Sequence, residues 1–462
     1  MTADDPAPPG EVLGRTGRGV LRRDGGHLVR DIDPRLCDEG FRTRLAELRA
    51  RNHPRTLAVV ADGAAPEAYR IKYDAPGDYR TLGSELAARP LWIERLTLVA
   101  AVCDALDVWH GSRLASVSLS PSDVLLTGQG AKTTVWLAPC PPVRLSSAYD
   151  LSGIDWQSLA VIAPEVIRGL PSDGRIEDMY ALGTLAALAI GCGVAAGEDL
   201  LEAQARGALL RTGPAASDIE PFLHDCPPIG TLFATIRRYR DHTVDARPAG
   251  ADNLRRAIGA ATDLAGLAQQ LRTADPAAAL TVLGWGAGRD AGERIAQLRL
   301  AAEISAETGD LPAALDHLDE AIALTPDQTF VADRHRRCDV LWRLWSQQPE
   351  DRDTWGSRLL DDLRYLQPLE TRGAELWIRE AEVLEHRKDY DGALHALYTA
   401  GERDAARLTI LLRSARLWRQ AGNHTNAEAV KALARRRIPT LVATGDLAEG
   451  AVQRWLDDFD AV

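Results

Sequence analysis

The chain has 462 residues, of which 45% are hydrophobic and 26% are charged, and its formal net charge at pH 7 is -12. This length exceeds what one hydrophobic core supports and predicts two or three domains. The negative charge argues against nucleic acid as a main partner, because binding to phosphates requires a basic surface. The six cysteines are widely spaced without a C-x-x-C pair, which favours buried free thiols in a cytoplasmic protein over zinc ligands or disulfides.

Residues 1–10 contain no apolar run and are expected to form a disordered tail without a signal peptide. Residues 11–83 predict short strands around one helix. A glycine-rich turn lies at the start of this region, at Gly14, Gly17 and Gly19. Glycines allow a backbone to close over phosphate groups, so this turn is a candidate nucleotide-binding element.

Further elements are predicted before residue 111. Arg30 lies in a strand, and a helix over 41–51 carries Arg44 and Glu47. A longer helix is predicted over 91–110, because apolar residues recur there at a helical period that faces a core. These apolar residues are Leu96, Val99, Val102, Leu106 and Trp109.

Four short motifs lie between residues 116 and 249. They are Ser116-Val117-Ser118-Leu119-Ser120-Pro121-Ser122-Asp123, Ala163-Pro164-Glu165, Asp178-Met179-Tyr180-Ala181-Leu182-Gly183 and Arg247-Pro248-Ala249. Together with the glycine-rich turn, their order and spacing resemble the landmarks of protein kinases. The resemblance implies an α+β, bilobal protein-kinase-like domain, with an N-lobe over 11–83 and a C-lobe over 84–260.

The resemblance also implies that the catalytic residues are replaced. Ser118 stands where the catalytic loop of the family has its Asp base, and Arg30 stands where a lysine holds the nucleotide phosphates. The segment 132–137, which includes Trp136, offers no carboxylate as the main magnesium ligand, so Asp123 is the lone candidate. Phosphoryl transfer depends on positioned charge, so we expect no kinase activity, no cofactor and no metal.

Three residues match landmarks that support the kinase fold. The resemblance implies that Glu165 pairs with Arg247, and that Asp178 caps its helix and holds the backbone of the catalytic loop. The segment 136–159 corresponds to the activation segment, and it contains hydroxyls, among them Ser158, that another kinase could phosphorylate.

The run from 180 to 197 is uncharged and nearly long enough to span a membrane. Its glycines divide it, and no basic flank follows it, so we interpret it as a buried core helix without membrane insertion.

The last third of the chain contains an internal repeat. Trp377, Ala381, Ala393 and Ala400 recur as Leu411, Ala415, Ala427 and Ala434, each offset by 34 residues (for example, 427 − 393 = 34). This is the period of the tetratricopeptide repeat, or TPR, so residues 261–462 predict an all-α TPR solenoid. Such arrays commonly bind a protein partner. The alternatives are that the array braces the kinase-like domain or forms a homodimer.

A kinase-like domain followed by such repeats resembles the actinobacterial protein kinase G family, without that family's rubredoxin module. The low lysine content is typical of a GC-rich bacterial genome. The leading hypothesis is therefore a catalytically inactive pseudokinase that acts as a regulatory scaffold or adaptor in bacterial signalling. The alternatives are an atypical Ser/Thr kinase or other nucleotide-dependent transferase, and a nucleotide-binding switch without turnover.

Overall fold

The computed structural model describes residues 10–50, 53–111, 119–128, 132–141, 153–170, 174–195, 199–286, 290–325, 331–370 and 373–462. The chain divides into two compact units, Met1–Ala278 and Ala279–Val462. The sequence predicted a boundary after residue 260. The division into units places α10 (Leu264–Leu271) in the first unit as well.

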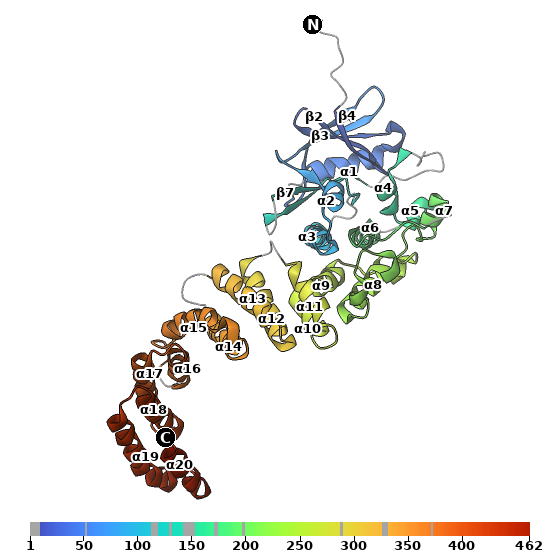
Figure 1. Ribbon diagram of the computed structural model, residues 1–462. Coiled ribbons are helices and arrows are strands. Elements are labelled where there is room, and N and C mark those ends of the chain that lie inside the picture. The colour runs from blue at the N-terminus through green and yellow to red at the C-terminus, as the bar shows by residue number, and fades with distance from the viewer. Residues whose placement is uncertain are drawn as a thin grey trace. The chain divides into compact units, whose positions relative to one another are not determined.

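The first unit begins with a five-stranded antiparallel sheet in the order β1-β2-β3-β5-β4. Its strands are β1 (Glu11–Thr16), β2 (Gly19–Asp24), β3 (His27–Ile32), β4 (Ala58–Ala64) and β5 (Tyr69–Asp74). Helix α1 (Glu39–Ala50) lies between β3 and β4 in the chain and next to the sheet (Figure 1). Its buried residues Phe41 and Leu45 belong to one hydrophobic cluster with the sheet residues Leu28 and Ile71. An antiparallel sheet covered by one helix resembles the N-lobe of a kinase.

A small second sheet and a group of helices complete the first unit. The sheet has the order β6-β7-β8, from β6 (Arg80–Thr81), β7 (Val124–Thr127) and β8 (Thr134–Leu137). The helices are α2 (Leu82–Ala88), α3 (Trp92–Gly111), α4 (Trp156–Ala160), α5 (Pro164–Ile167), α6 (Gly174–Ala189), α7 (Leu200–Ala205), α8 (Pro227–Tyr239), α9 (Asp252–Ala261) and α10, and α11 (Pro276–Gly284) follows across the boundary.

The long predicted helices form the core of this region. All five apolar residues predicted to face a core from α3 are buried, as expected from their helical spacing. The uncharged run lies on α6 from Tyr180 to Ala189, and every residue of this helix from 178 to 187 is buried. The interpretation as a core helix is therefore confirmed for this part of the run. None of the described helices combines the length and the apolar character that crossing a membrane requires.

All six cysteines are free and buried, as the sequence predicted. Burial raises the pKa of the Cys192 thiol to about 11, so this side chain is a neutral thiol near pH 7.

The second unit is entirely helical in its described part. After α11, which crosses the boundary, the described helices pack as four neighbouring pairs followed by one short helix (Figure 1). The pairs are α12 (Ala291–Thr308) with α13 (Leu311–Leu324), α14 (Val331–Gln347) with α15 (Arg352–Leu366), α16 (Glu375–His386) with α17 (Tyr390–Arg403), and α18 (Leu408–Gln420) with α19 (His424–Thr444), and α20 (Val452–Asp460) follows.

The residues of the predicted repeat lie at matching positions in the last two pairs. Ala381 on α16 and Ala415 on α18 are both fully buried, and so are Ala400 on α17 and Ala434 on α19. Small side chains at these places allow the paired helices to approach closely. The periodicity therefore corresponds to a repeated packing of helix pairs.

A buried ion pair joins distant segments of the first unit. Arg247, which follows α8, donates to both carboxylate oxygens of Glu165 on α5, at 2.6 and 2.8 Å, and both side chains are almost completely buried. The Arg247 guanidinium also lies over the ring of Tyr180, 4.9 Å from its centre. The pairing that the kinase resemblance implied is therefore present in the structure.

Asp178 does not cap its helix in the way that the resemblance implied. It lies inside α6, which begins at Gly174, so it is not the N-terminal cap of that helix. Its carboxylate instead contacts Nε2 of His110, at 2.9 Å, near the end of α3. Asp178 therefore ties two core helices together, and the residues 112–118 that it was expected to hold lie outside the described residues.

The Glu165–Arg247 pair generates a first prediction. Glu165→Gln removes the negative charge and leaves the Arg247 guanidinium buried without its counter-ion. Breaking a buried pair in this way costs roughly 3–5 kcal/mol of unfolding free energy. Urea denaturation of the full chain, followed through the transition of the first unit, measures this loss. The control Asp252→Asn, at a pair on the surface of α9, is expected to change stability by about 0–1 kcal/mol, and an equally small effect of Glu165→Gln would contradict the prediction.

Candidate functional site

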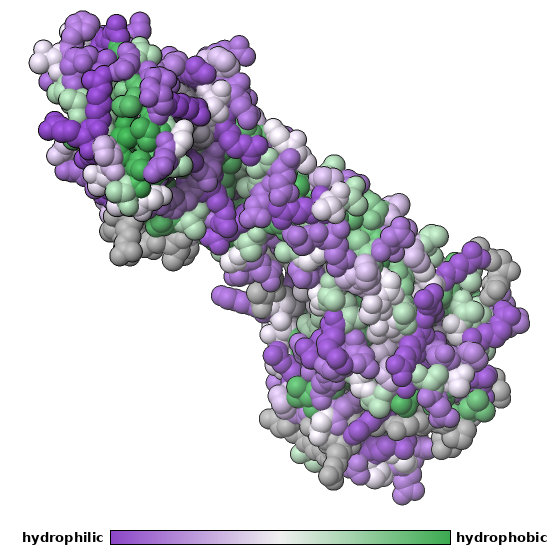
Figure 2. Space-filling view, turned by 90° about the horizontal axis from the view of Figure 1, so that it is seen from below, coloured by the Kyte–Doolittle hydropathy of each residue, from purple (hydrophilic) through white to green (hydrophobic). Residues whose placement is uncertain are grey.

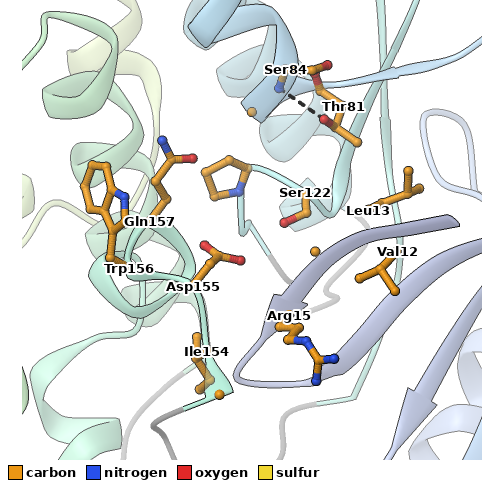
Figure 3. A pocket seen from close by; sticks show the side chains of 14 residues that line it. Val12, Leu13, Arg15, Thr81, Ser84, Ser122, Ile154, Asp155, Trp156 and Gln157 are labelled. Atoms are coloured by element: carbon orange, nitrogen blue, oxygen red, sulfur yellow. Dashed lines mark hydrogen bonds between the residues drawn. The ribbon is translucent and has the colours of Figure 1, made fainter.

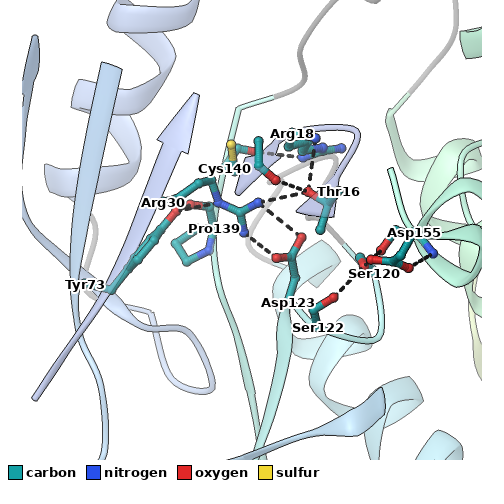
Figure 4. A network of polar contacts seen from close by, with 12 residues as sticks. Thr16, Arg18, Arg30, Tyr73, Ser120, Ser122, Asp123, Pro139, Cys140 and Asp155 are labelled. Atoms are coloured by element: carbon teal, nitrogen blue, oxygen red, sulfur yellow. Dashed lines mark hydrogen bonds and ion pairs between the residues drawn. The ribbon is translucent and has the colours of Figure 1, made fainter. Parts of the chain in front are cut away.

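The candidate site is centred on a buried ion pair between Arg30 and Asp123 (Figure 4). Arg30 lies in the middle of β3, where it pairs with Leu21 of β2 and Ile71 of β5. Asp123 directly precedes β7. The guanidinium contacts both carboxylate oxygens, at 2.8 and 3.2 Å, and neither side chain is exposed.

Two hydroxyl groups complete the surroundings of Arg30. The Tyr73 hydroxyl on β5 accepts from Nε of Arg30 at 3.3 Å and donates to the carbonyl oxygen of Pro139 at 2.9 Å. The Thr16 hydroxyl at the end of β1 accepts from the guanidinium at 3.4 Å. Burial disfavours the charge of Arg30, but Asp123, together with Tyr73 and Cys140, outweighs this effect, so the pKa of Arg30 is raised. Burial also raises the pKa of Tyr73, so its phenol is neutral near pH 7.

The sequence analysis placed Arg30 at the position that holds nucleotide phosphates and gave Asp123 as the lone candidate metal ligand. In the structure these two residues bind each other. Helix α1 supplies no alternative carboxylate, because its two acidic residues, Glu39 and Glu47, are exposed, and so is Arg44. Among the described residues, no group of three or more His, Cys, Asp or Glu side chains gathers as a metal site.

The glycine-rich turn packs directly onto the loop that carries Asp123. A Cβ atom on Gly14 would lie only 2.0 Å from the Oγ atom of Ser122, and one on Gly17 would lie 2.8 Å from Ile162. Gly19 has a φ of 108°, which favours glycine. The three predicted glycines are therefore needed for the conformation of the turn and for its close approach to the neighbouring segments at Ser122 and Ile162.

A chain of hydroxyls replaces the charged groups of the catalytic loop. The Oγ atoms of Ser120 and Ser158 are hydrogen-bonded at 2.6 Å, and the Ser158 hydroxyl donates to the carboxylate of Asp155 at 2.9 Å (Figure 4). Ser158 is only 1% exposed. Ser158 therefore does not present its hydroxyl to another kinase, which was one of the possibilities that the sequence left open for this segment. Ser118 lies outside the described residues.

Trp136 belongs to a different part of the structure. It lies on β8 opposite Leu125, and its indole N–H donates to the hydroxyl of Thr127 at 3.1 Å. The structure does not bring it into the network around Arg30. The residues just after β8 approach that network instead, because the carbonyl of Pro139 accepts from Tyr73 and that of Cys140 accepts from Arg18 at 2.6 Å.

Sequence reasoning missed Tyr73 and Thr16 as partners of Arg30. A signal for Tyr73 was present in the alternation along β5, where Tyr69, Ile71 and Tyr73 are buried on one face. A buried arginine needs several acceptors, so a tyrosine on the neighbouring strand was a reasonable candidate. Thr16 gave no comparable signal, because its position at the end of a strand depends on the turn.

No protein-family model matches the chain, and no curated protein matches it either. Among solved structures, it is similar to the kinase domain of PknI from Mycobacterium tuberculosis, with 22% identity over 54% of this chain and 92% of that chain, at a TM-score of 0.34. It is similar to Rad53 in complex with AMP-PNP, with 17% identity over 55% of this chain and 63% of that chain, at a TM-score of 0.38. It is also similar to MamA from Desulfovibrio magneticus, with 14% identity over 38% of this chain and 94% of that chain, at a TM-score of 0.30. Because these values are low, the matches assign no activity to this chain.

The ion pair of the site generates a second prediction. Arg30→Met leaves the Asp123 carboxylate buried without a cation and is expected to destabilise the first unit by roughly 3–5 kcal/mol. The double variant with Asp123→Leu is expected to regain most of this loss, because apolar residues can replace both members of a buried pair at little cost. Urea denaturation of the four proteins of this double-mutant cycle measures the coupling energy.

A matched control lies in the same sheet. Arg70 on β5 pairs with Asp31 but is 42% exposed, so Arg70→Met is expected to cost about 0–1 kcal/mol. If the losses of Arg30→Met and Asp123→Leu simply add in the double variant, the two residues do not stabilise each other and the prediction is wrong.

Proposed function

We propose that the chain is a catalytically inactive regulatory scaffold in bacterial signalling, in which the kinase-like unit does not transfer phosphate and the helical unit binds a protein partner. The observation that carries this proposal is the Arg30–Asp123 pair, with both side chains fully buried. Groups that bind each other in the interior are not available to phosphates and magnesium.

The energetics of the pair support this interpretation. A nucleotide that used Arg30 or Asp123 would first have to separate them. Separating a buried pair costs about 4 kcal/mol, which corresponds to a loss of roughly 1,000-fold in affinity unless the ligand replaces every contact. The glycine-rich turn would also have to lift from Ser122, which it contacts closely.

The chemistry available in this region supports the same conclusion. Transfer of a phosphoryl group requires a general base for the attacking hydroxyl and cations that hold the phosphates. The sequence has Ser118 in place of the base. Ser120 carries no charge that could hold a phosphate, and its hydroxyl is hydrogen-bonded to that of Ser158. The residues Ala138, Pro139 and Cys140 that follow β8 carry no carboxylate.

The helical unit supplies the proposed surface for a partner. The first helices of successive pairs are joined by ion pairs, such as Arg299 on α12 with Asp333 on α14. Exposed large hydrophobic side chains instead occur on, or just after, the second helix of a pair. These side chains are Leu324, Tyr365, Leu369 and Tyr398. Figure 2 shows that hydrophilic residues cover most of the face drawn, so exposed apolar side chains are a minority on it. We therefore propose that the partner contacts the second helices of the TPR-like array through apolar groups.

The inactive kinase-like unit generates a third prediction. ATP, ADP and GTP, with or without magnesium, are expected to leave the thermal unfolding of the full chain unchanged, because Arg30 and Asp123 bind each other in place of phosphate and metal. A ligand at a hundred times its dissociation constant would add roughly 2.7 kcal/mol of stability. A shift of several degrees with any nucleotide would support the nucleotide-binding alternatives. Sustained incorporation of labelled phosphate that is lost in Asp123→Asn would overturn the proposal.

The helical unit generates a fourth prediction. Replacing the exposed residues Leu369 and Tyr398 with serine is expected to weaken binding of the captured and identified partner by roughly tenfold, a loss of about 1.4 kcal/mol. Titration of the full chain measures this change, and the same replacements at the exposed residues Leu170 and Leu200 of the first unit serve as controls. Sedimentation that reveals only self-association through these residues would indicate a homodimer interface in place of partner binding.

A further inference from the structure

Two clefts of the first unit differ in the charge of their walls. The larger, of about 600 Å³, is lined by Gly14, Ser122 and Asp155 and belongs to the candidate site already described (Figure 3). The smaller, of about 340 Å³, lies between α8 and α9, which pack against each other (Figure 1). We call it the α8–α9 groove. Its volume is at the lower end of the range of pockets that bind small ligands.

One face of α8 forms the first wall of the α8–α9 groove. Thr231, Thr235 and Arg238 line it, at spacings of four and three residues that place them on the same side of the helix. They cover about 10 Å along the helix axis. Arg237 is exposed as well, but it lies on another side of α8 and does not line the groove.

One face of α9 forms the second wall. Asn253, Arg256 and Ala260 line it, again at helical spacing, together with the buried residue Ala257. The two alanines have the shortest side chains on this face, so they leave room between the longer polar side chains. The groove therefore combines an open centre with guanidinium, hydroxyl and amide groups on both sides.

The floor of the groove is held by hydrogen bonds within the protein. The Tyr239 hydroxyl accepts from the backbone N–H of Leu254 at 3.3 Å and donates to the carbonyl of Gly250, which joins the end of α8 to the start of α9. Pro248, which also lines the groove, is buried and directly follows Arg247 of the buried ion pair with Glu165. Because these residues are fixed, a ligand would meet a preorganised surface.

The polar groups of the groove are mainly donors. In the described part of the chain, no ion pair joins Arg238, and no hydrogen bond uses the hydroxyl of Thr231. Nη2 of Arg256 donates to Oδ1 of Asn253 at 2.7 Å, so the acceptor of that amide is used and its NH₂ group is left to donate. Nε of Arg256 pairs with Asp252 at 3.0 Å, which leaves Nη1 as a further donor.

The charges of the groove favour an anion. None of its lining residues is an Asp or a Glu, although the chain as a whole has a net charge of -12. The carboxylate of Asp252, which precedes Asn253, pairs with Arg255 and Arg256. The larger cleft differs in this respect, because Asp155 lines it. The two arginines of the α8–α9 groove therefore concentrate positive charge on an otherwise acidic protein.

We propose that the α8–α9 groove binds a phosphate monoester, with Arg238 and Arg256 as the cationic contacts and Asn253 and Thr231 as neutral donors. A phosphate monoester carries almost two negative charges near pH 7 and three terminal oxygens, so it can accept from both walls at once, whereas a carboxylate has only two oxygens. The inference goes beyond the proposed scaffold function: a unit that does not transfer phosphate would recognise a phosphate group at a separate place.

The test is isothermal titration of the full chain with three probes. They are N-acetyl-O-phosphoserine amide, inorganic phosphate and N-acetylserine amide. The first two are expected to bind and the neutral serine derivative is not. Arg238→Gln and Arg256→Gln are each expected to weaken binding of phosphoserine by roughly tenfold or more. Ala260→Leu, which narrows the groove without changing its charge, is expected to weaken binding as well.

The matched control is Arg237→Gln, which removes the same charge from the neighbouring position of α8 outside the groove. It is expected to leave the affinity for phosphoserine unchanged. The side chains of Arg237, Arg238, Arg256 and Ala260 are all exposed, so the thermal unfolding of these variants should match that of the wild type. A loss of binding in the groove variants then reports on the site and not on folding.

The relative affinities of the probes distinguish two sources of the phosphate. Binding of phosphoserine at least tenfold tighter than inorganic phosphate would support a phosphorylated side chain of a partner protein, and similar affinities would support free phosphate as the ligand. The proposal is wrong if neither probe binds at millimolar concentration. It is also wrong if Arg237→Gln weakens binding as much as Arg238→Gln, because a general attraction to positive charge would then explain the result.

Nucleotides also carry phosphate groups, so the nucleotide test of the scaffold function is repeated on the double variant Arg238→Gln with Arg256→Gln. Stabilisation by a nucleotide that persists in this variant would come from the candidate site around Arg30 and would contradict the inactive-kinase proposal alone. Stabilisation that is lost in this variant would come from the α8–α9 groove and would support the phosphate site. The two proposals can therefore fail separately.

Discussion

The buried pair of Arg30 and Asp123 is the interaction on which the first unit depends. A guanidinium placed in the middle of a sheet loses its hydration, and the structure must replace it with acceptors. Asp123 supplies the counter-charge from the loop before β7, and hydroxyls of Tyr73 and Thr16 supply further acceptors. The position of this loop against the sheet, and of the glycine turn against the loop, therefore follows from the need to satisfy one arginine.

The two buried ion pairs of the first unit differ in how far the sequence could predict them. Glu165 and Arg247 occur in motifs whose register with kinases implied their contact, and the structure contains it. Arg30 and Asp123 are 93 residues apart, and each was assigned to a ligand by its motif. A motif states which position a residue occupies, but not how two changed residues at neighbouring positions adjust to each other. The sequence therefore predicted the framework of this region and missed its central contact.

The 34-residue period predicted which residues of the helical unit are buried, but it did not predict the ion pairs of this unit. The alanine repeat predicted which positions of the helical unit are buried, as Ala381 and Ala415 show. It did not predict the ion pairs between successive first helices, such as Arg379 with Asp339 and Arg413 with Glu385. Long charged side chains reach across several positions, so their pairing leaves no fixed period in the sequence. These pairs neutralise charges within the unit, and they leave exposed apolar groups on the second helices as the more distinctive surface.

The packing of the glycine-rich turn fixes the end of strand β1. In an enzyme that binds a nucleotide, a glycine-rich turn must open and close, and a ligand beside it would have to follow that motion. Here Gly14 is packed against Ser122, and Thr16 accepts hydrogen bonds from the Arg30 side chain and the Arg18 backbone, so the end of β1 is fixed. The contacts that satisfy Arg30 therefore also hold the glycine-rich turn in one position against the loop that carries Ser122.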